Sequence, residues 1–244
     1  MTNTLAQRPA PVRTRIKICG LTREADVDSA VLAGVDAIGF VLYAPSPRSV
    51  SAQRAAELAR RLPAFVTPVL LFVNATPTEV LQACEQVGNA TLQFHGDESP
   101  DWCHTASAQG TRPYLRAARI PLGEQNGFDL VQYAQTYSQA QALLLDAHVD
   151  GYGGAGKVFN WSLLPQNVNA HLVLSGGLNA ANVGDGIACV RPRCLSLAVD
   201  VSSGVEAEDG YGRVLKGIKD PGKINQFVAA VRAVDKRLDE LIPS

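Results

Sequence analysis

Two side chains able to exchange protons stand at the ends of strand-like segments that are far apart in the chain. Cys19 ends the segment Arg15–Cys19, and Asp146 follows the apolar run Ala142–Leu145. A carboxyl group at the end of such a run is partly desolvated, which favours its protonated form and suits a general acid. A helix cap or a loop salt bridge explains Asp146 alone equally well. For Cys19 alone, a small buried apolar residue is the better interpretation, because free cysteines are usually buried.

Glycine-rich clusters follow three late strand-like segments and could bind a phosphate group. They are 151–156, which contains Gly154 and Gly156; Ser175, Gly176 and Gly177; and Asp200 followed by Ser202, Ser203 and Gly204. Glycines let backbone N–H groups approach an anion closely, and hydroxyl groups add further donors. Ordinary turn formation is the alternative. Because two of the clusters follow adjacent late strands, we expect phosphate binding there.

Two further polar residues follow early strands. Arg48 lies in the proline-stiffened stretch 45–49, and its guanidinium could hold a carboxylate through two hydrogen bonds or could simply be solvated. His95 follows the fourth strand and could be a hydrogen-bond donor or a structural imidazole. No spacing brings histidines and carboxylates together in a metal-binding pattern, so we expect no metal ion.

The elements that must position these residues are short apolar segments alternating with helical patterns. The expected strands are Arg15–Cys19, Ala37–Leu42, Val69–Val73, Thr91–Phe94, Pro113–Ala117, Ala142–Leu145, Leu172–Leu174 and Leu195–Val199. The expected helices are Glu24–Ala33, Ala52–Arg61, Pro77–Val87, Pro100–Ala108, Phe128–Gln139, a short Trp161–Leu164, Ala180–Ala188 and Ile224–Leu241. Thr76 and Asp220 each precede a proline, which is typical of a helix N-cap.

Eight strand-then-helix units predict a parallel sheet that closes into a single (β/α)8 TIM barrel, formed by residues 14–244. An open, doubly wound sheet is the alternative. Such a sheet usually carries a G-x-G-x-x-G loop after its first strand, whereas this first strand is followed by Gly20, Leu21 and Thr22. In a barrel, catalytic groups lie at the carboxyl ends of the strands, where the candidates fall. We expect the polar stretch 204–222 to be a surface loop and residues 1–13 to be a flexible tail.

Composition excludes several other classes of protein. The 244 residues include 22 Lys and Arg against 23 Asp and Glu, a net charge of −1, so we expect no nucleic-acid partner. No apolar run approaches the ~20 residues of a membrane helix, and the N-terminus lacks the apolar core of a secretory signal. The five cysteines are an odd number without a C-x-x-C pair, which argues against a disulfide framework and predicts a reducing cytoplasm.

Taken together, the motifs resemble those of the phosphoribosylanthranilate isomerase family. The matching blocks are KICGLT at 17–22, GF at 39–40 with SPR at 46–48, QFHGDE at 93–98, LLD at 144–146, GGAG at 153–156 with FNW at 159–161, LSGGL at 174–178 and VDVSSGVE at 199–206. They run in order through nearly the whole chain, and the first and last blocks are the most specific. The sequence departs from the family pattern at Ala155, where threonine is usual, in a longer stretch at 206–219, and in its N-terminal tail.

The resemblance implies an Amadori rearrangement in tryptophan biosynthesis, from a phosphoribosyl aminoaldose to an aminoketose, without metal or other cofactor. It implies that Asp146 is the general acid, that Cys19 is the general base and that Arg48 holds the anthranilate carboxylate. The loops around Gly154, Gly177 and Ser203 would hold the phosphate of a small phosphoribosyl substrate, and His95 and Asp200 would also contact that substrate. The expected ligand is then this small-molecule substrate alone. The expected oligomeric state is a monomer or a homodimer.

Two questions stay open at this point. Lys17 shares the inward face of the first strand with Cys19, and it could supply positive charge to the thiol or fill a barrel layer beside a carboxylate such as Asp200. The barrel isomerase of histidine biosynthesis performs the same chemistry on a related substrate, but with carboxylates in both acid and base roles. A non-catalytic phosphosugar-binding barrel is a further alternative, and it would need neither Cys19 nor Asp146.

Overall fold

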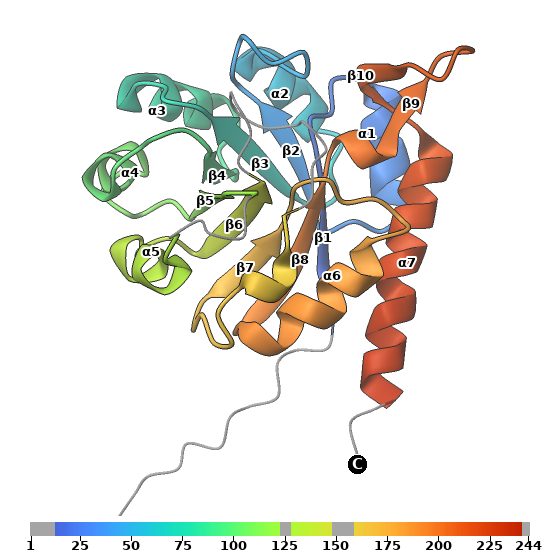
Figure 1. Ribbon diagram of the computed structural model, residues 1–244. Coiled ribbons are helices and arrows are strands. Elements are labelled where there is room, and N and C mark those ends of the chain that lie inside the picture. The colour runs from blue at the N-terminus through green and yellow to red at the C-terminus, as the bar shows by residue number, and fades with distance from the viewer. Residues whose placement is uncertain (1–12, 123–127, 148–158, 241–244) are drawn as a thin grey trace, which may run out of the picture.

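The protein is a closed barrel of eight parallel strands that pair in chain order, with β1 against β8 at the seam (Figure 1). The computed structural model describes residues 13–122, 128–147 and 159–240, so the expected tail lies outside the described residues except for residue 13. The strands are β1 (Arg15–Cys19), β2 (Ala37–Val41), β3 (Thr67–Phe72), β4 (Thr91–Phe94), β5 (Tyr114–Ile120), β6 (Ala142–Ala147), β7 (His171–Leu174) and β8 (Ser196–Val201). The predicted (β/α)8 barrel is confirmed.

Helices connect the strands and cover the outside of the barrel (Figure 1). They are α1 (Glu24–Leu32), α2 (Ala52–Ala59), α3 (Pro77–Gln86), α4 (Pro100–Ala106), α5 (Leu130–Thr136), α6 (Val183–Val190) and α7 (Pro221–Glu240), with short 3-10 turns η1 (Trp161–Leu163) and η2 (Arg191–Arg193). None of the helices in the described ranges is long and apolar enough to cross a membrane.

The predicted helix starts at the two prolines are confirmed by their caps. The Thr76 hydroxyl accepts from the Glu79 amide while the Glu79 carboxylate accepts from the Thr76 amide, a reciprocal capping box at the start of α3. An Asp220 carboxylate oxygen accepts from the amide of Lys223 at 2.8 Å and caps α7.

Helix α6 begins three residues later than the sequence pattern suggested. The Asn179 amide donates to the side chain of Asn182, and the Ala181 amide donates to the side chain of Asn179. These side-chain acceptors hold the segment in a turn, because asparagine competes with helical backbone bonding.

The prediction that 204–222 is a surface loop is wrong at both of its ends. After the turn η3 (Ser203–Val205), strands β9 (Glu206–Glu208) and β10 (Val214–Lys219) form an antiparallel hairpin that stands out from the barrel (Figure 1). The tip is exposed, but the side chains of Glu206 and Lys219 at its base are fully buried and form an ion pair. The polar composition of the segment therefore reflects buried charges as well as solvated ones.

The barrel has an apolar outer layer and an interior that holds both apolar and polar side chains. Alternate strand residues such as Ile16, Ile18 and Val199 are buried between the sheet and the helices. The inward positions include Lys17 and Cys19, as the strand alternation predicted, and both are buried. Polar groups inside the barrel can therefore be fixed by cross-strand partners.

A buried ionic cluster closes the amino-terminal end of the barrel. Asp235, on α7, accepts hydrogen bonds from the amide and the hydroxyl of Thr14 at 2.8 and 2.5 Å. Arg191 donates to the same carboxylate at 2.7 Å, and Arg232 donates to it at 3.3 Å. The last helix is thereby tied to the residue that enters the first strand.

We expect Asp235→Ala to lower the free energy of unfolding by about 3–5 kcal/mol, because it leaves the Arg191 guanidinium buried without its anion. Urea unfolding followed by circular dichroism measures the change. Asp239→Ala, which removes an exposed carboxylate of the same helix, is the control and should have little effect. Equal stability of the two variants would contradict a structural role for the cluster.

Candidate active site

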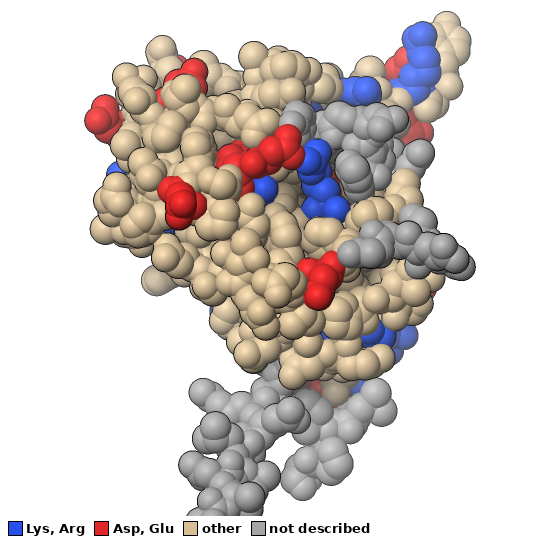
Figure 2. All heavy atoms as spheres, turned by 60° about the vertical axis from the view of Figure 1, so that its left-hand side comes forward, with Lys and Arg blue, Asp and Glu red and all other residues tan. Residues whose placement is uncertain are grey.

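A cavity lies at the carboxyl ends of the barrel strands, where the sequence placed the reactive groups. It is lined by the predicted residues Cys19, Arg48, His95, Asp146, Ser175, Gly176, Gly177, Asp200, Ser202 and Ser203. On the face shown in Figure 2, Lys and Arg atoms form no extended patch, and some of them lie within a hollow.

Three of the predicted site residues do not appear among the lining residues. Gly154 and Gly156 lie outside the described residues. Gly204 does not line the cavity, and a Cβ atom there would lie 2.0 Å from the Leu178 carbonyl oxygen. Its role in the described structure is to let the loop after β8 pack against the loop after β7.

Cys19 sits beside a buried ion pair that spans the barrel seam. Lys17 Nζ lies 2.9 Å from Asp200 Oδ1, and the two residues are direct neighbours across β1 and β8. Burial raises the pKa of the Cys19 thiol, and the positive charge of Lys17 opposes this rise. Burial acts to lower the pKa of Lys17, but Asp200 and Cys19 outweigh it and the net shift is upward. Both roles considered for Lys17, charge near the thiol and pairing with Asp200, are therefore present.

Gly39, on the neighbouring strand β2, leaves room for this arrangement. It lies directly opposite Cys19 in the register, and a Cβ atom at position 39 would stand 2.7 Å from Cys19 Sγ and 3.0 Å from Lys17 Nζ. Contacts that short force something to move.

Asp146 is held by donors from two directions. His95 Nε2 lies 3.0 Å from Asp146 Oδ2, and the Ala147 amide donates to Oδ1 at 2.9 Å. The Gln93 amide nitrogen lies 3.0 Å from His95 Nδ1, so the imidazole carries its proton on Nε2 and donates it toward Asp146. Gln93 on β4 and His95 directly after the strand have the same inward parity, a signal that could have identified Gln93 as a site residue.

The loops after β7 and β8 present glycines and hydroxyl groups to the cavity. Gly176 and Gly177 have φ angles of +78° and +64°, a left-handed conformation that favours glycine. Asn182 donates to the Gly177 carbonyl at 2.9 Å and fixes this loop. Ser202 donates to the Cys19 carbonyl at 3.0 Å, which joins the last loop to the first strand.

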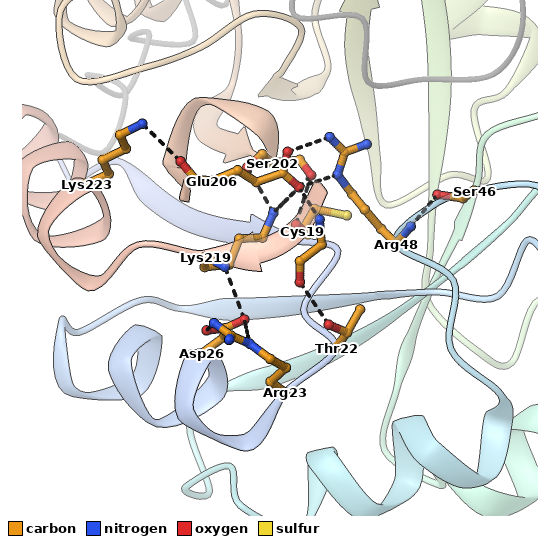
Figure 3. A network of polar contacts seen from close by, with 11 residues as sticks. Cys19, Thr22, Arg23, Asp26, Ser46, Arg48, Ser202, Glu206, Lys219 and Lys223 are labelled. Carbon is orange, nitrogen blue, oxygen red and sulfur yellow. Dashed lines mark hydrogen bonds and ion pairs between the residues drawn. The ribbon is translucent and has the colours of Figure 1, made fainter. Parts of the chain in front are cut away.

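Arg48 is buried and paired, so the interpretation as a solvated loop residue is wrong. Its Nε and Nη2 atoms donate to the two carboxylate oxygens of Glu206 at 2.6 and 2.8 Å. Figure 3 shows these two residues together with Lys219 and Ser202 beside Cys19. Burial acts to raise the pKa of the Glu206 carboxyl, but its bonds to Arg48 and its pairing with Lys219 hold that pKa below its usual range. Sequence reasoning missed Glu206 and Lys219 as parts of this network.

The arrangement is suited to moving protons on a bound anion. A thiol and a carboxyl group line one cavity, hydroxyl- and glycine-rich loops lie at one side of it, and a guanidinium lies at another. No cluster of three or more His, Cys, Asp or Glu side chains suited to hold a metal occurs within the described ranges.

Fold and site together are those of a (β/α)8 barrel enzyme, with a cavity at the carboxyl ends of its strands that contains a thiol and a carboxyl group. The family model for N-(5'-phosphoribosyl)anthranilate isomerase matches residues 16–230, and the chain belongs to that family. The proteins of that name from Methylibium petroleiphilum and Leptothrix cholodnii are 60% and 59% identical over 227 and 228 residues. Each alignment covers 93% of this chain, and 98% and 95% of the respective relative.

Solved structures lead to the same family. Phosphoribosyl anthranilate isomerase from Thermotoga maritima is 34% identical with a TM-score of 0.75, covering 90% of this chain and 99% of that one. A structure of the enzyme in complex with reduced 1-(o-carboxyphenylamino)-1-deoxyribulose 5-phosphate is 33% identical, with a TM-score of 0.72, and covers 90% of this chain and 99% of that chain.

We expect Gly39→Ala to lower kcat roughly 10- to 100-fold, because the new methyl group displaces the Cys19 thiol from its position. Steady-state kinetics, with circular dichroism to check the fold, measures the effect. Gly88→Ala is the matched control, since nothing lies within 4 Å of a Cβ atom there. Unchanged kcat in Gly39→Ala would show that the thiol has room to spare.

Proposed function

We propose that this chain converts N-(5'-phosphoribosyl)anthranilate to 1-(2-carboxyphenylamino)-1-deoxyribulose 5-phosphate by an acid–base Amadori rearrangement in tryptophan biosynthesis. The observation that carries the proposal is the presence of Cys19 and Asp146 in one cavity at the strand ends of a barrel of this family. Loss of anthranilate-type fluorescence on adding the aminoaldose tests it directly, and absence of turnover by the purified protein would refute it.

In the first step, Asp146 donates a proton to the furanose ring oxygen, and the C1–O bond breaks to leave a Schiff base. The neighbours of Asp146 suit this role, since His95 Nε2–H and the Ala147 amide stabilise the carboxylate that remains after the transfer.

In the second step, Cys19 removes the proton from C2, and the electron pair of the C–H bond neutralises the iminium. The resulting enolamine tautomerises to the ketone. A thiolate is the form that can act as a base, and burial disfavours it. Lys17 offsets part of that cost through its charge, so the pair Lys17–Asp200 acts as support for the base.

Substrate binding divides between two sides of the cavity. We assign the phosphate to the hydroxyl groups of Ser175 and Ser203 and the backbone amides of Gly177 and Ser202, and the anthranilate carboxylate to Arg48. A phosphate needs several converging donors, which two neighbouring loops with glycines and serines can supply. The relative solved with a reduced product analogue is a family member that binds a compound with both of these anionic groups.

We also propose a reducing, cytoplasmic setting and a monomer or homodimer that needs no cofactor. Cys19, Cys84, Cys103, Cys189 and Cys194 are all free thiols, as a reducing compartment would require. The Thermotoga maritima relative is described as dimeric, with monomers that were generated from it.

The acid and base assignments are tested by near-isosteric substitutions. Cys19→Ser keeps the size but not the acidity of the thiol, and Asp146→Asn keeps the shape but cannot give up a proton. Each should lower kcat at least about a hundredfold with little change in KM, because one positioned proton-transfer group contributes about 10²–10⁴ in rate.

The pH profile of kcat/KM supplies the complementary measurement. It should be bell-shaped in the unmodified enzyme, since one group must be protonated and the other deprotonated. Because burial raises the pKa of the thiol, the limb of the profile that reports Cys19 should lie at alkaline rather than neutral pH. Cys103→Ser is the control for Cys19→Ser and should keep normal kcat, since Cys103 is a buried thiol outside the cavity. Near-normal kcat in Cys19→Ser would remove Cys19 from the mechanism.

Arg48→Ala should raise KM about 10- to 100-fold, the loss of roughly 1.5–3 kcal/mol expected for a charged hydrogen bond. The effect on kcat should be smaller, because the carboxylate is remote from the reacting carbons. Arg54→Ala, which removes a partly exposed arginine of α2 outside the cavity, should leave KM unchanged. An unchanged KM in Arg48→Ala would return the guanidinium to a purely structural role beside Glu206.

A further inference from the structure

The base of the β9–β10 hairpin holds an excess of positive charge next to the cavity. Arg48 and Lys219 are cations and Glu206 is an anion, and the exposed fractions of their side chains are 9%, 0% and 0%. The other charged groups near this cluster already have partners. Asp26, whose carboxylate accepts from the Lys219 backbone amide, is paired with Arg23. The three buried groups therefore sum to one unmatched positive charge.

The partners of Lys219 Nζ match an ammonium group. Burial lowers the pKa of Lys219, and the charge of the neighbouring Glu206 carboxylate opposes that shift. Nζ donates to the Ser202 carbonyl at 2.9 Å, to the Ser202 hydroxyl at 3.3 Å and to Glu206 Oε1 at 3.4 Å. An ammonium has three N–H groups to donate, and a neutral amine has two. The side chain has no exposed surface, so it cannot touch a ligand in the cavity.

Arg48, by contrast, faces the cavity. Its aliphatic stem lies over Gly20, where a Cβ atom would stand 2.6 Å from Arg48 Cδ. Its Nε and Nη2 atoms are used by Glu206, while Nη1 has no hydrogen-bond partner within the described ranges. In Figure 3 the Glu206 carboxylate lies between the Arg48 guanidinium and the amine of Lys219.

We infer that Lys219 is a positioning residue that neutralises Glu206, so that Glu206 can orient Arg48 without cancelling the positive charge Arg48 offers to the substrate carboxylate. This inference rests on the proposed role of Arg48. Without Lys219, the bidentate pair of Arg48 and Glu206 would be neutral overall, and its attraction for an anion would fall in the poorly solvated cavity.

The test compares two ligands that differ only in the carboxylate. One is reduced 1-(2-carboxyphenylamino)-1-deoxyribulose 5-phosphate, and the other is the same compound with a phenyl ring that lacks the carboxyl group. The ratio of their Kd values, measured by calorimetry, isolates the carboxylate contribution. Effects on phosphate binding or on Cys19 cancel in this ratio.

We expect Lys219→Met to reduce the preference for the carboxylate ligand about tenfold or more, while the Kd of the decarboxylated ligand changes little. The double variant Lys219→Met/Glu206→Gln restores the net charge of +1 and should recover part of the preference. Lys223→Met removes a cation of the same hairpin base that donates to the Glu206 carbonyl rather than to its carboxylate, and it should keep the full preference.

The outcomes separate this inference from the proposed function. If Arg48→Ala leaves the preference intact, the carboxylate site itself is misassigned. If Arg48→Ala abolishes the preference but Lys219→Met does not change it, the role of Lys219 is refuted. Equal weakening of both ligands by Lys219→Met, with no recovery in the double variant, would assign Lys219 to hairpin folding alone and overturn the inference.

Discussion

Closure of the sheet between β1 and β8 places one buried ion pair on which the site depends. Lys17 and Asp200 face each other across the seam, inside a barrel where unpaired charges are costly. Cys19 lies two residues after Lys17, and Ser202 lies two residues after Asp200. The Ser202 hydroxyl donates a hydrogen bond to the Cys19 carbonyl. The contact that joins the first strand to the last therefore also sets the position and the electrostatic surroundings of the thiol.

Local patterns were sufficient to predict the barrel. Short apolar segments bounded by caps such as Thr76 marked the elements, and strand alternation correctly turned Lys17 and Cys19 inward. The same patterns could not predict pairings between distant residues. Glu206 and Lys219 occur in a polar, glycine-rich stretch that looks solvated, and only the path of the hairpin brings them against Arg48. Gln93 was missed for a different reason, since its inward strand parity with His95 was a local signal that could have identified it.

The cavity is lined by buried charged groups that contribute little to the stability of the folded protein. Replacing buried ion pairs with apolar residues of similar volume is often neutral or stabilising in proteins. Here the buried charges lie at the carboxyl ends of the strands, around the groups that we propose transfer protons and bind anions. At the opposite end, the cluster around Asp235 uses charge to tie the last helix to the first strand. The two ends of the barrel thus employ similar interactions for different purposes.

The hairpin that carries Glu206 and Lys219 has an uneven tolerance for changes in length. Its tip is in solvent, with Tyr211 88% exposed, whereas both of its ends are anchored in the barrel mouth. Residues added or removed at the tip would leave the anchors in place, because exposed loops accept such changes. A single residue inserted within β10 next to Lys219 would instead reverse which side chains point inward. The barrel can therefore acquire a larger or smaller projection, or an attached label, at this point without altering the surroundings of the substrate.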